Sequence, residues 1–456
     1  MPTARSMYSL AAAGLATIMV VRFVLTRFSL FSRVKGEKEQ PQKEQAESRI
    51  VDKNAVLIAL SKVSGTGWDE LSKDFCGTVV MDISRIPSLI QKSVYLCGDL
   101  GKAEGLRLEA AERVLAIREL SYGYGDSMPW PLINVGAVPI LIHGVGVFYR
   151  RFFEPGVDFF HKISSEHTFQ ALTESTKPGT AHRMGIYLTP VEQDGEDLSF
   201  RLLRCSTNLS GPTANFAAHD RLIVGALNEE AARIFENQAP LNHVLAQIYI
   251  NTPAKDGEKE RKAKIKAHAD KTKDMPRNGL MAFCTFYDQL ERLQPLEKHS
   301  FDLGHKGVSG LTKLYFRLKD PVAQRAGSRL KPQFSVTLYP DSVFLMPLST
   351  NRLYTHEIRP PALGVGLAPT RLGYVVRCSE TVAVHRNGQT FLKAAGALIP
   401  LQQPTREGMA ELRKKYAEEN MLDSVVHYPP TLFSMNEGDY SAPALSDAVE
   451  AEKEGG

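Results

Sequence analysis

Two arginines six positions apart, Arg371 and Arg377, are the residues whose type and spacing point most directly to chemistry. They belong to the segment Pro369–Ser379, whose β-branched and aromatic residues are typical of a strand. Because strand side chains alternate between two faces, both arginines would share one face with Val375. Two guanidiniums on one half-enclosed face need an anion, and a bound carboxylate ligand would supply it.

A second short motif, His268 and Asp270, is the only His-x-Asp sequence in the chain. Residues two apart on a strand point to the same side, so an imidazole and a carboxylate would converge. A motif this short also arises by chance, and taken alone a solvated surface pair explains it better. His356, followed by the two arginines, makes a functional site a better interpretation than a solvated surface pair. His-x-Asp, a distant His and then Arg fit an iron site of two His and one carboxylate beside a carboxylate cosubstrate.

Each residue type suits that chemistry. Two neutral imidazoles and one hard oxygen hold Fe(II) on one side and leave positions open for a 2-oxo acid and O2. A cation must then neutralise the far carboxylate of the acid, and Arg371 is the candidate. The sequence therefore predicts a metal site made of His268, Asp270 and His356.

The segments that must position these residues change character near Pro240. After it, short segments rich in β-forming residues are separated by Gly, Pro or charged turns, which favours an antiparallel sandwich or barrel. Before it, the spacing of apolar residues indicates helices, so the expected fold class is α+β. The predicted strands are 244–250, 263–270, 279–287, 310–318, 333–339, 342–347 and 371–379, and the predicted helices are 102–120, 157–174 and 226–237.

From about residue 241 to residue 379, the chain resembles the AlkB-like 2-oxoglutarate/Fe(II) dioxygenases. The segment Leu241–Tyr249 is similar to a family strand that ends in a cosubstrate-binding Asn-x-Tyr, with Gln247 in place of the Asn. The Asn that often follows the first arginine by two positions is Gly373 here. The residues that match the family's iron ligands and its two arginines are His268, Asp270, His356, Arg371 and Arg377.

The resemblance implies a double-stranded β-helix, or jelly roll, with flanking helices and iron at one mouth. It implies oxidative demethylation of N-alkylated DNA or RNA, with O2 and 2-oxoglutarate as cosubstrates. Because Gln247 and Gly373 depart from the family pattern, they alter two usual cosubstrate contacts. The implied ligands of Fe(II) are His268, Asp270 and His356, and the implied 2-oxoglutarate contacts are Arg371, Arg377, Tyr249 and Gln247.

Two other functions stay open. The same oxygenase chemistry could act on a protein or lipid near a membrane, or the jelly roll could be a non-catalytic binding module. Residues 255–273 hold eight bases and four acids, which could track phosphates or form a solvated hairpin. The segments Phe148–Gly156 and His182–Leu188 carry basic and aromatic residues that could grip a nucleotide, or could be ordinary core and rim.

The N-terminus is separate from the expected fold. Residues 7–31 are apolar apart from Arg22 and Arg27, and no acid precedes Glu37. This pattern predicts a membrane anchor that leaves the main domain in the cytosol, with a mitochondrial presequence as the alternative. Five scattered cysteines without a CxxC motif favour a reducing compartment, and a net charge of +4 does not by itself indicate nucleic acid.

The expected organisation therefore has five parts. Residues 1–34 are an apolar anchor or targeting segment, and residues 35–50 are a charged linker. Residues 51–145 are a mixed helical region. Residues 146–400 are the dioxygenase domain, with a lid and leader at 146–240 and the jelly-roll core at 241–400. Residues 401–456 contain a helix and an acidic tail that is expected to be disordered from about Ser434.

Overall fold

The computed structural model describes residues 46–445 except 52, 124, 126–127, 155, 174–179, 205–208, 256, 258, 298, 326 and 328. The chain divides into two units, 1–46 and 47–456, and almost all described residues belong to the second. The predicted anchor at residues 7–31 lies outside the described residues. None of the described helices combines the length and hydrophobicity that a membrane crossing requires.

The N-terminal region is built on a parallel sheet, so the mixed helical region expected at 51–145 is a wrong prediction. The predicted helix over 102–120 is a short 3-10 helix, Leu100–Gly105, followed by a strand. Apolar residues pack on both faces of this sheet, which explains the uninterrupted apolar run from Val114 to Ile117. The strands in sheet order are β3 (Thr78–Val80), β2 (Ala55–Ala59), β4 (Ser93–Asp99), β5 (Arg113–Tyr122) and β6 (Leu132–Ile133), and helix α2 (Thr66–Asp74) follows β2.

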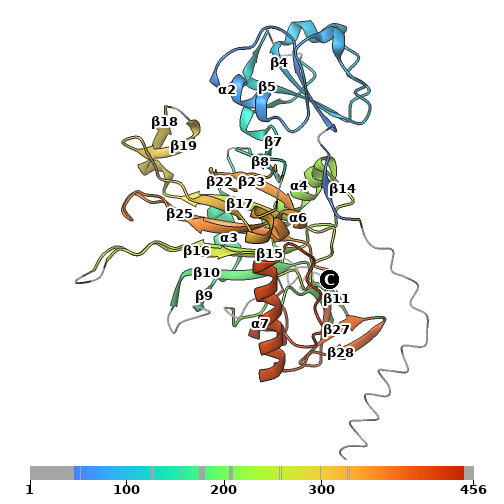
Figure 1. The fold of residues 1–456 in the computed structure, drawn as a ribbon, viewed down its shortest axis with the longest axis vertical. Helices are drawn as coiled ribbons and strands as arrows, with labels where there is room; N and C mark the ends of the chain where they lie inside the picture. Colours follow the sequence, from blue (N-terminus) through green and yellow to red (C-terminus); the bar gives the residue numbers. More distant parts are fainter. Residues whose placement is uncertain are drawn as a thin grey trace, which may run out of the picture. The chain divides into compact units, whose positions relative to one another are not determined.

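The largest sheet among the described residues has nine strands, and from β10 to β7 its neighbours run antiparallel (Figure 1). All seven strands predicted after Pro240 are present, in this sheet or in the one that faces it. The order is β13 (Ala214–Asn215), β10 (Thr180–Thr189), β15 (His243–Tyr249), β25 (Thr370–Arg377), β17 (Leu280–Asp288), β23 (Ser342–Pro347), β8 (Gly146–Tyr149) and β7 (Ile140–Ile142), with β9 (Gln170–Thr173) paired to β10.

A four-stranded antiparallel sheet packs against one face of the nine-stranded sheet. Met281 and Phe344 of the larger sheet share a buried core with Phe316 and Phe334 of the smaller one. Strand β24, which carries His356, was not predicted from the sequence. The order is β16 (Ile265–His268), β24 (Tyr354–Arg359), β21 (Lys313–Leu318) and β22 (Gln333–Thr337).

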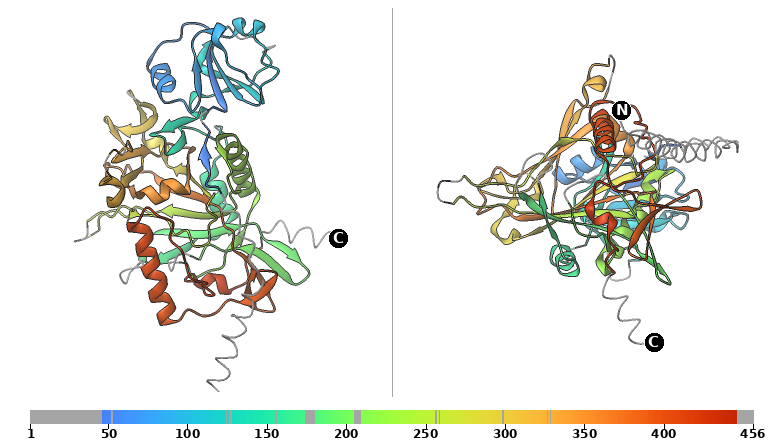
Figure 2. Two further views of the ribbon diagram at one scale, coloured as in Figure 1. Left: turned by 45° about the vertical axis from the view of Figure 1, so that its right-hand side comes forward. Right: turned by 90° about the horizontal axis from the view of Figure 1, so that it is seen from below.

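Two helices cover the opposite face of the nine-stranded sheet (Figure 2). They are α3 (Phe159–Glu166) and α4 (Ala218–Ile234), and they lie within or near the helices predicted at 157–174 and 226–237. Apolar residues of both helices pack against Leu372 of β25 in one core. The architecture is therefore a mixed one, mostly of sheets with several helices.

The register of the nine-stranded sheet forms rows across its central strands. In one row, Tyr249 of β15 pairs with Arg183 of β10 and with Arg371 of β25. In the next row, Gln247 pairs with Gly185 and Gly373. All of these positions face the smaller sheet, because side chains two apart on a strand share a face.

The remaining elements flank this pair of sheets. Helix α7, Arg406–Met421, confirms the helix expected in 401–456 and is the long red helix of Figures 1 and 2. The others are α5 (Asp320–Ala323), α6 (Leu348–Leu353), the hairpin strands β18 (Gln294–Leu296), β19 (His299–His305) and β20 (Val308–Ser309), and the sheet of β11 (Glu192–Asp194), β12 (Asp197–Arg201), β26 (Val382–Arg386), β27 (Gln389–Ala394) and β28 (Ala397–Pro400).

Two boundary predictions are wrong. Residues at the end of the expected linker form strand β1 (Arg49–Ile50), which pairs with β14 (Phe235–Glu236). The tail expected to be disordered from about Ser434 is folded to residue 445, and its 3-10 helix Glu437–Tyr440 holds the buried carboxylate of Asp439. Asp439 accepts hydrogen bonds from the side chains of Ser434 and Asn436, so local side-chain hydrogen bonds order a segment whose composition indicated disorder.

Candidate metal centre

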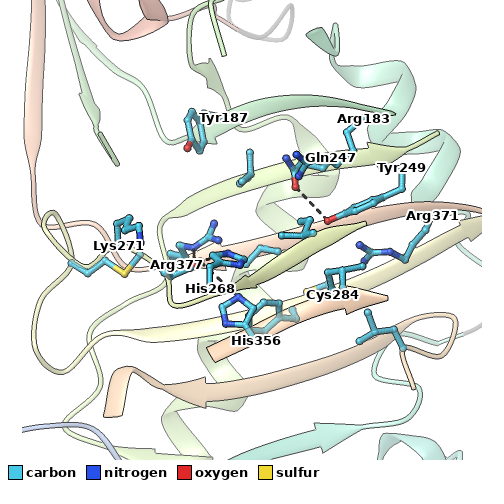
Figure 3. A pocket seen from close by; sticks show the side chains of 18 residues that line it. Arg183, Tyr187, Gln247, Tyr249, His268, Lys271, Cys284, His356, Arg371 and Arg377 are labelled. Atoms are coloured by element: carbon cyan, nitrogen blue, oxygen red, sulfur yellow. Dashed lines mark hydrogen bonds and ion pairs between the residues drawn. The ribbon is translucent and has the colours of Figure 1, made fainter. Parts of the chain in front are cut away.

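The structure brings His268, Asp270 and His356 together between the two sheets (Figure 3). Each offers a donor atom, and all three donors lie within 4.8 Å of one another. The Nε2 atoms of His268 and His356 are 3.3 Å and 3.8 Å from Oδ1 of Asp270. Donors that share one ion lie about 3 Å apart, because each is about 2.1 Å from the metal. We call these three residues the pocket cluster.

A bulge in β16 aims the first imidazole into the pocket. The pairing of β16 with β24 shifts between Ile265 and His268, so both side chains line the pocket although they are three positions apart. Nδ1 of His268 lies 2.9 Å from the carbonyl oxygen of Lys266, to which it can donate a hydrogen bond. Nε2 is then left as the lone-pair donor toward the centre.

The carboxylate of Asp270 is held by one strong bond and keeps one oxygen open. Nε of Arg377 donates to Oδ2 at 2.6 Å, which leaves Oδ1 facing both imidazoles. Burial by itself would raise the pKa of Asp270, but the charge of Arg377 and the nearby imidazoles hold that pKa well below its usual range. Asp270 is therefore an anion at neutral pH.

His356 is the most enclosed member of the pocket cluster. It lies on β24, with the ring of Phe283 edge-on at 5.4 Å between centroids. Burial, together with the charge of neighbouring His268, lowers the pKa of His356 to about 3. The imidazole is therefore neutral, which is the form that binds a metal. Its Nδ1 is buried without a hydrogen-bond partner among the described residues.

Residues far along the chain fix the backbone around Asp270. Strand β16 ends at His268, so strand alternation does not by itself place Asp270 beside it. Asn351 accepts from the backbone N–H of Asp270 at 2.8 Å and donates to its carbonyl oxygen at 3.0 Å. From α7, Asn420 accepts from the N–H of Ala269 at 2.7 Å.

Glu419 of α7 adds a further contact. It accepts from the backbone N–H of Thr272 at 3.0 Å, just after the pocket cluster segment. No motif in the sequence links α7 or Asn351 to the site, and sequence reasoning missed Asn351, Glu419 and Asn420. Only the folded structure shows that these three residues hold the segment 269–272, which follows β16.

Arg371 places a buried guanidinium in the same pocket. It is 4% exposed, and among the described residues its Nε and Nη2 atoms have no hydrogen-bond partner. Its guanidinium lies over the ring of Tyr249, 3.9 Å from the centroid. It also crosses Gly373, where a Cβ atom would lie 2.8 Å from Nη1. Glycine at this position leaves room for that path.

The other residues predicted around a cosubstrate also line the pocket. Gln247 and Tyr249 are adjacent on one face of β15, and Tyr249 Oη is 3.4 Å from Oε1 of Gln247. Arg377 lines the pocket as well, but its guanidinium donates to Asp270, so it orients a candidate metal ligand. The cavity has a volume of about 200 Å³.

The residues present suit both groups that the sequence predicted. Two imidazoles and one carboxylate form the donor set of non-haem Fe(II). Buried guanidinium atoms without an acceptor suit the far carboxylate of a 2-oxo acid, because buried polar atoms normally have partners.

A second group of possible ligands lies on the opposite face of the nine-stranded sheet. Glu166, His167 and Asp220 also have donors within 4.8 Å of one another, and we call them the cap cluster. Asp220 accepts from the backbone N–H of Ala217 at the start of α4. It also contacts Nε2 of His167 at 2.6 Å and the hydroxyl of Tyr374 at 2.7 Å.

Comparison with known proteins finds similarity to solved structures, at low sequence identity. No family model and no curated protein matches the chain. One similar solved structure is the non-heme alpha-ketoglutarate-dependent epimerase SnoN from nogalamycin biosynthesis, at 12% identity over 50% of this chain and 72% of that chain, with a TM-score of 0.25. Another is a bsmA homologue from Methylobium petroleophilum PM1, at 12% identity over 48% and 77%, with a TM-score of 0.23. Similarity this weak carries no argument, so the choice of a function depends on the geometry of the site.

Proposed function

We propose that this protein is an Fe(II)- and 2-oxoglutarate-dependent dioxygenase on a double-stranded β-helix. The observation that carries the proposal is the shared pocket: the three donors of the pocket cluster lie within 4.8 Å of one another beside the buried, partnerless guanidinium atoms of Arg371. Either feature alone has simpler explanations, such as an ion-pair network or a cation over an aromatic ring. Together they match a metal and an acidic cosubstrate.

The residues have separate roles in this proposal. His268 and His356 would hold the metal through Nε2, and Asp270 would hold it through Oδ1 while Arg377 occupies Oδ2. Arg371 would neutralise the far carboxylate of 2-oxoglutarate, with Tyr249 and Gln247 bordering that site. When bound, the metal and 2-oxoglutarate supply the oxidation of a substrate C–H bond to C–OH by O2, with succinate and CO2 as coproducts.

The proposed substrate class is N-alkylated DNA or RNA. An N-methyl group oxidised to N–CH2OH releases formaldehyde and leaves N–H. Exposed Lys264 and Lys266, next to His268 in the chain, support this class because lysines neutralise phosphates. A methylated base in a duplex would have to be flipped out to reach the pocket.

A second candidate keeps the chemistry but changes the substrate. The apolar residues 7–31 favour a protein or lipid substrate close to a membrane. In that proposal these residues anchor the protein and the dioxygenase domain lies in the cytosol, with a mitochondrial location as the alternative.

Anaerobic absorbance tests the cofactor proposal directly. Fe(II) and 2-oxoglutarate added to the wild type should give a charge-transfer band in the visible. His268→Ala should lose the band, and Arg317→Gln, which changes an exposed arginine on β21, should keep it. A wild type that gives no band would contradict the proposal and favour a non-catalytic binding module.

Aerobic turnover then tests the substrate class. Methylated oligonucleotides should yield formaldehyde and succinate in equal amounts. Succinate without formaldehyde would reject nucleic-acid demethylation and leave the protein or lipid candidate.

A further inference from the structure

Strand β15 is flanked by two strands with the same local pattern. On β25, Arg371 precedes Gly373 by two positions, and on β10, Arg183 precedes Gly185 by two positions. The register aligns them, because Tyr249 pairs with both arginines. Both guanidiniums therefore start from the same row on the pocket face of the sheet.

The two arginines differ in what lies over their glycines. Arg371 crosses Gly373 and is buried. At Gly185 the space is taken by Leu172, whose Cδ1 would lie 3.3 Å from an added Cβ. Arg183 is half-buried and lines the pocket, where Figure 3 draws it next to Gln247. The Cα atoms of the two arginines are about 10 Å apart, since they are separated by two strand spacings.

Arg183 differs from the other cations of the pocket in having no assigned role. Arg377 bonds to Asp270, and Arg371 is assigned to the cosubstrate. Lys271 donates to the carbonyl oxygens of Ala269 and Tyr416. Among the described residues, the side chain of Arg183 has no hydrogen bond or ion pair, and only its backbone is paired, in the ladder between β10 and β15. A guanidinium directed into a pocket without an acceptor is suited to an external anion.

The charge balance of the pocket leads to the same conclusion. Its charged lining consists of one carboxylate, Asp270, and four cations. The two charges of a divalent metal and the two of 2-oxoglutarate cancel, so they leave this excess unchanged. A substrate that brings a negative group would offset it.

We propose that Arg183 receives an anionic group of the substrate, a phosphate or a carboxylate, at a subsite separate from that of 2-oxoglutarate. This inference rests on the proposed function, because it assumes that Arg371 is occupied by the cosubstrate. It makes Arg183 a specificity-determining residue, since a neutral analogue of the substrate would leave its guanidinium unpaired.

Simple anions can test the subsite before the substrate is known. The protein is loaded with Mn(II) and 2-oxoglutarate, and inorganic phosphate or acetate is added. The paramagnetic metal should enhance the relaxation of phosphorus in bound phosphate, or of the methyl protons in bound acetate. Arg183→Gln should weaken binding of the preferred anion by about 10-fold, the equivalent of one charged hydrogen bond. The control Arg317→Gln should bind the anion as the wild type does.

The Fe(II) and 2-oxoglutarate band is measured on the same three proteins. An unchanged band in Arg183→Gln, with weaker anion binding, is the expected result. The dependence of the relaxation on anion concentration gives each affinity; tighter binding of phosphate than of acetate indicates a phosphate-bearing substrate, and the reverse indicates a carboxylate. Equal anion binding by wild type and Arg183→Gln overturns the inference while the proposed function stands. Loss of the band in Arg183→Gln also overturns it, because Arg183 then belongs to the cosubstrate site. A wild type without the band contradicts the proposed function itself.

Discussion

The pocket cluster and the cap cluster have similar residues but differ in how many hydrogen bonds the protein makes to the central aspartate. Each joins histidine to a buried aspartate, and each brings three donors within 4.8 Å. Asp220 of the cap cluster contacts three donors of the protein and is completely buried. Asp270 of the pocket cluster accepts a bond from Arg377 on Oδ2, and its Oδ1 faces the two imidazoles of that cluster.

The difference shows that composition and proximity do not identify a metal site. What matters is whether a lone pair stays uncommitted after the protein has made its own hydrogen bonds. A single strand serves both clusters, because β25 sends Tyr374 to one face and Arg377 to the other. The cap cluster stabilises the start of α4, and the pocket cluster has donor atoms available for an ion.

The largest expected effect is the loss of metal binding in Asp270→Ala. Changing an outer partner of a ligand typically weakens metal binding about 10- to 100-fold, so loss of a direct ligand should exceed about 100-fold. Anaerobic titration with Fe(II) measures the affinity, and Asp220→Ala is the matched control, with an affinity close to that of the wild type. Equal losses in the two variants would remove the distinction between the clusters.

Asp220→Ala should act on stability instead. It leaves the hydroxyl of Tyr374, the imidazole of His167 and the N–H of Ala217 without their acceptor inside the protein. The free energy of unfolding should fall by about 3 kcal/mol, as expected when a buried partner is removed. Urea unfolding gives the value, and Asp220→Asn should lose less because its amide oxygen still accepts a bond. A metal-dependent stability of the wild type that disappears in Asp220→Ala would assign an ion to the cap cluster.

A smaller effect is expected from Asn351→Ala. Asn351 touches the backbone of Asp270 and no donor atom, so the ligands stay but their segment loosens. Metal affinity should fall about 10-fold, the lower end of the range for outer-shell partners. Asn351→Asp tests the geometry, because it keeps the acceptor for the N–H of Asp270 and loses the donor to its carbonyl oxygen. Affinity unchanged in Asn351→Ala would show that the strands alone fix the site.

The smallest effect concerns pH. Burial lowers the pKa of His356 to about 3, against about 6.5 for an unfolded chain. Between those two pH values only the unfolded chain binds a proton at His356. The contribution of neutral His356 to the free energy of unfolding is therefore present in full above about pH 6.5 and is lost as the pH falls. Between pH 7.0 and 5.5, urea unfolding of the metal-free wild type should lose about 1 kcal/mol more than His356→Gln does. Equal losses in both proteins would mean that the pKa of His356 is the same in the folded and the unfolded chain.

The sequence predicted the part of the fold whose pattern is local. The alternation in β25 separates Arg371 and Arg377 from Leu372, and the structure places the two sets on opposite faces. Strand chemistry also predicted β15, β17 and β23. The helix predicted at 102–120 was wrong because this segment contains most of strand β5. A strand that is buried on both faces has consecutive apolar residues, and such a run also fits a helical spacing.

The candidate site residues come together through pairing of strands that are far apart in the sequence, and no local sequence pattern predicts that pairing. His268 and His356 are direct partners across β16 and β24, and β24 itself was missed. Arg183 lay in a segment already noted for its basic and aromatic residues, but its row with Tyr249 and Arg371 appears only in the register of the sheet. The bonds from α7 to Ala269 and Thr272 join residues 151 and 147 positions apart.

Those bonds from α7 have a consequence for biosynthesis. A nascent chain already carries every proposed ligand and both arginines of β25 when residue 377 leaves the ribosome, but Glu419 and Asn420 are still to be translated. Until they emerge, the loop that holds Asp270 lacks the hydrogen bonds from its backbone to α7, so the proposed metal centre is complete only after this helix has been made. A protein truncated before residue 406 would keep every proposed ligand in its sequence, and we expect it to bind the metal more weakly than the full chain.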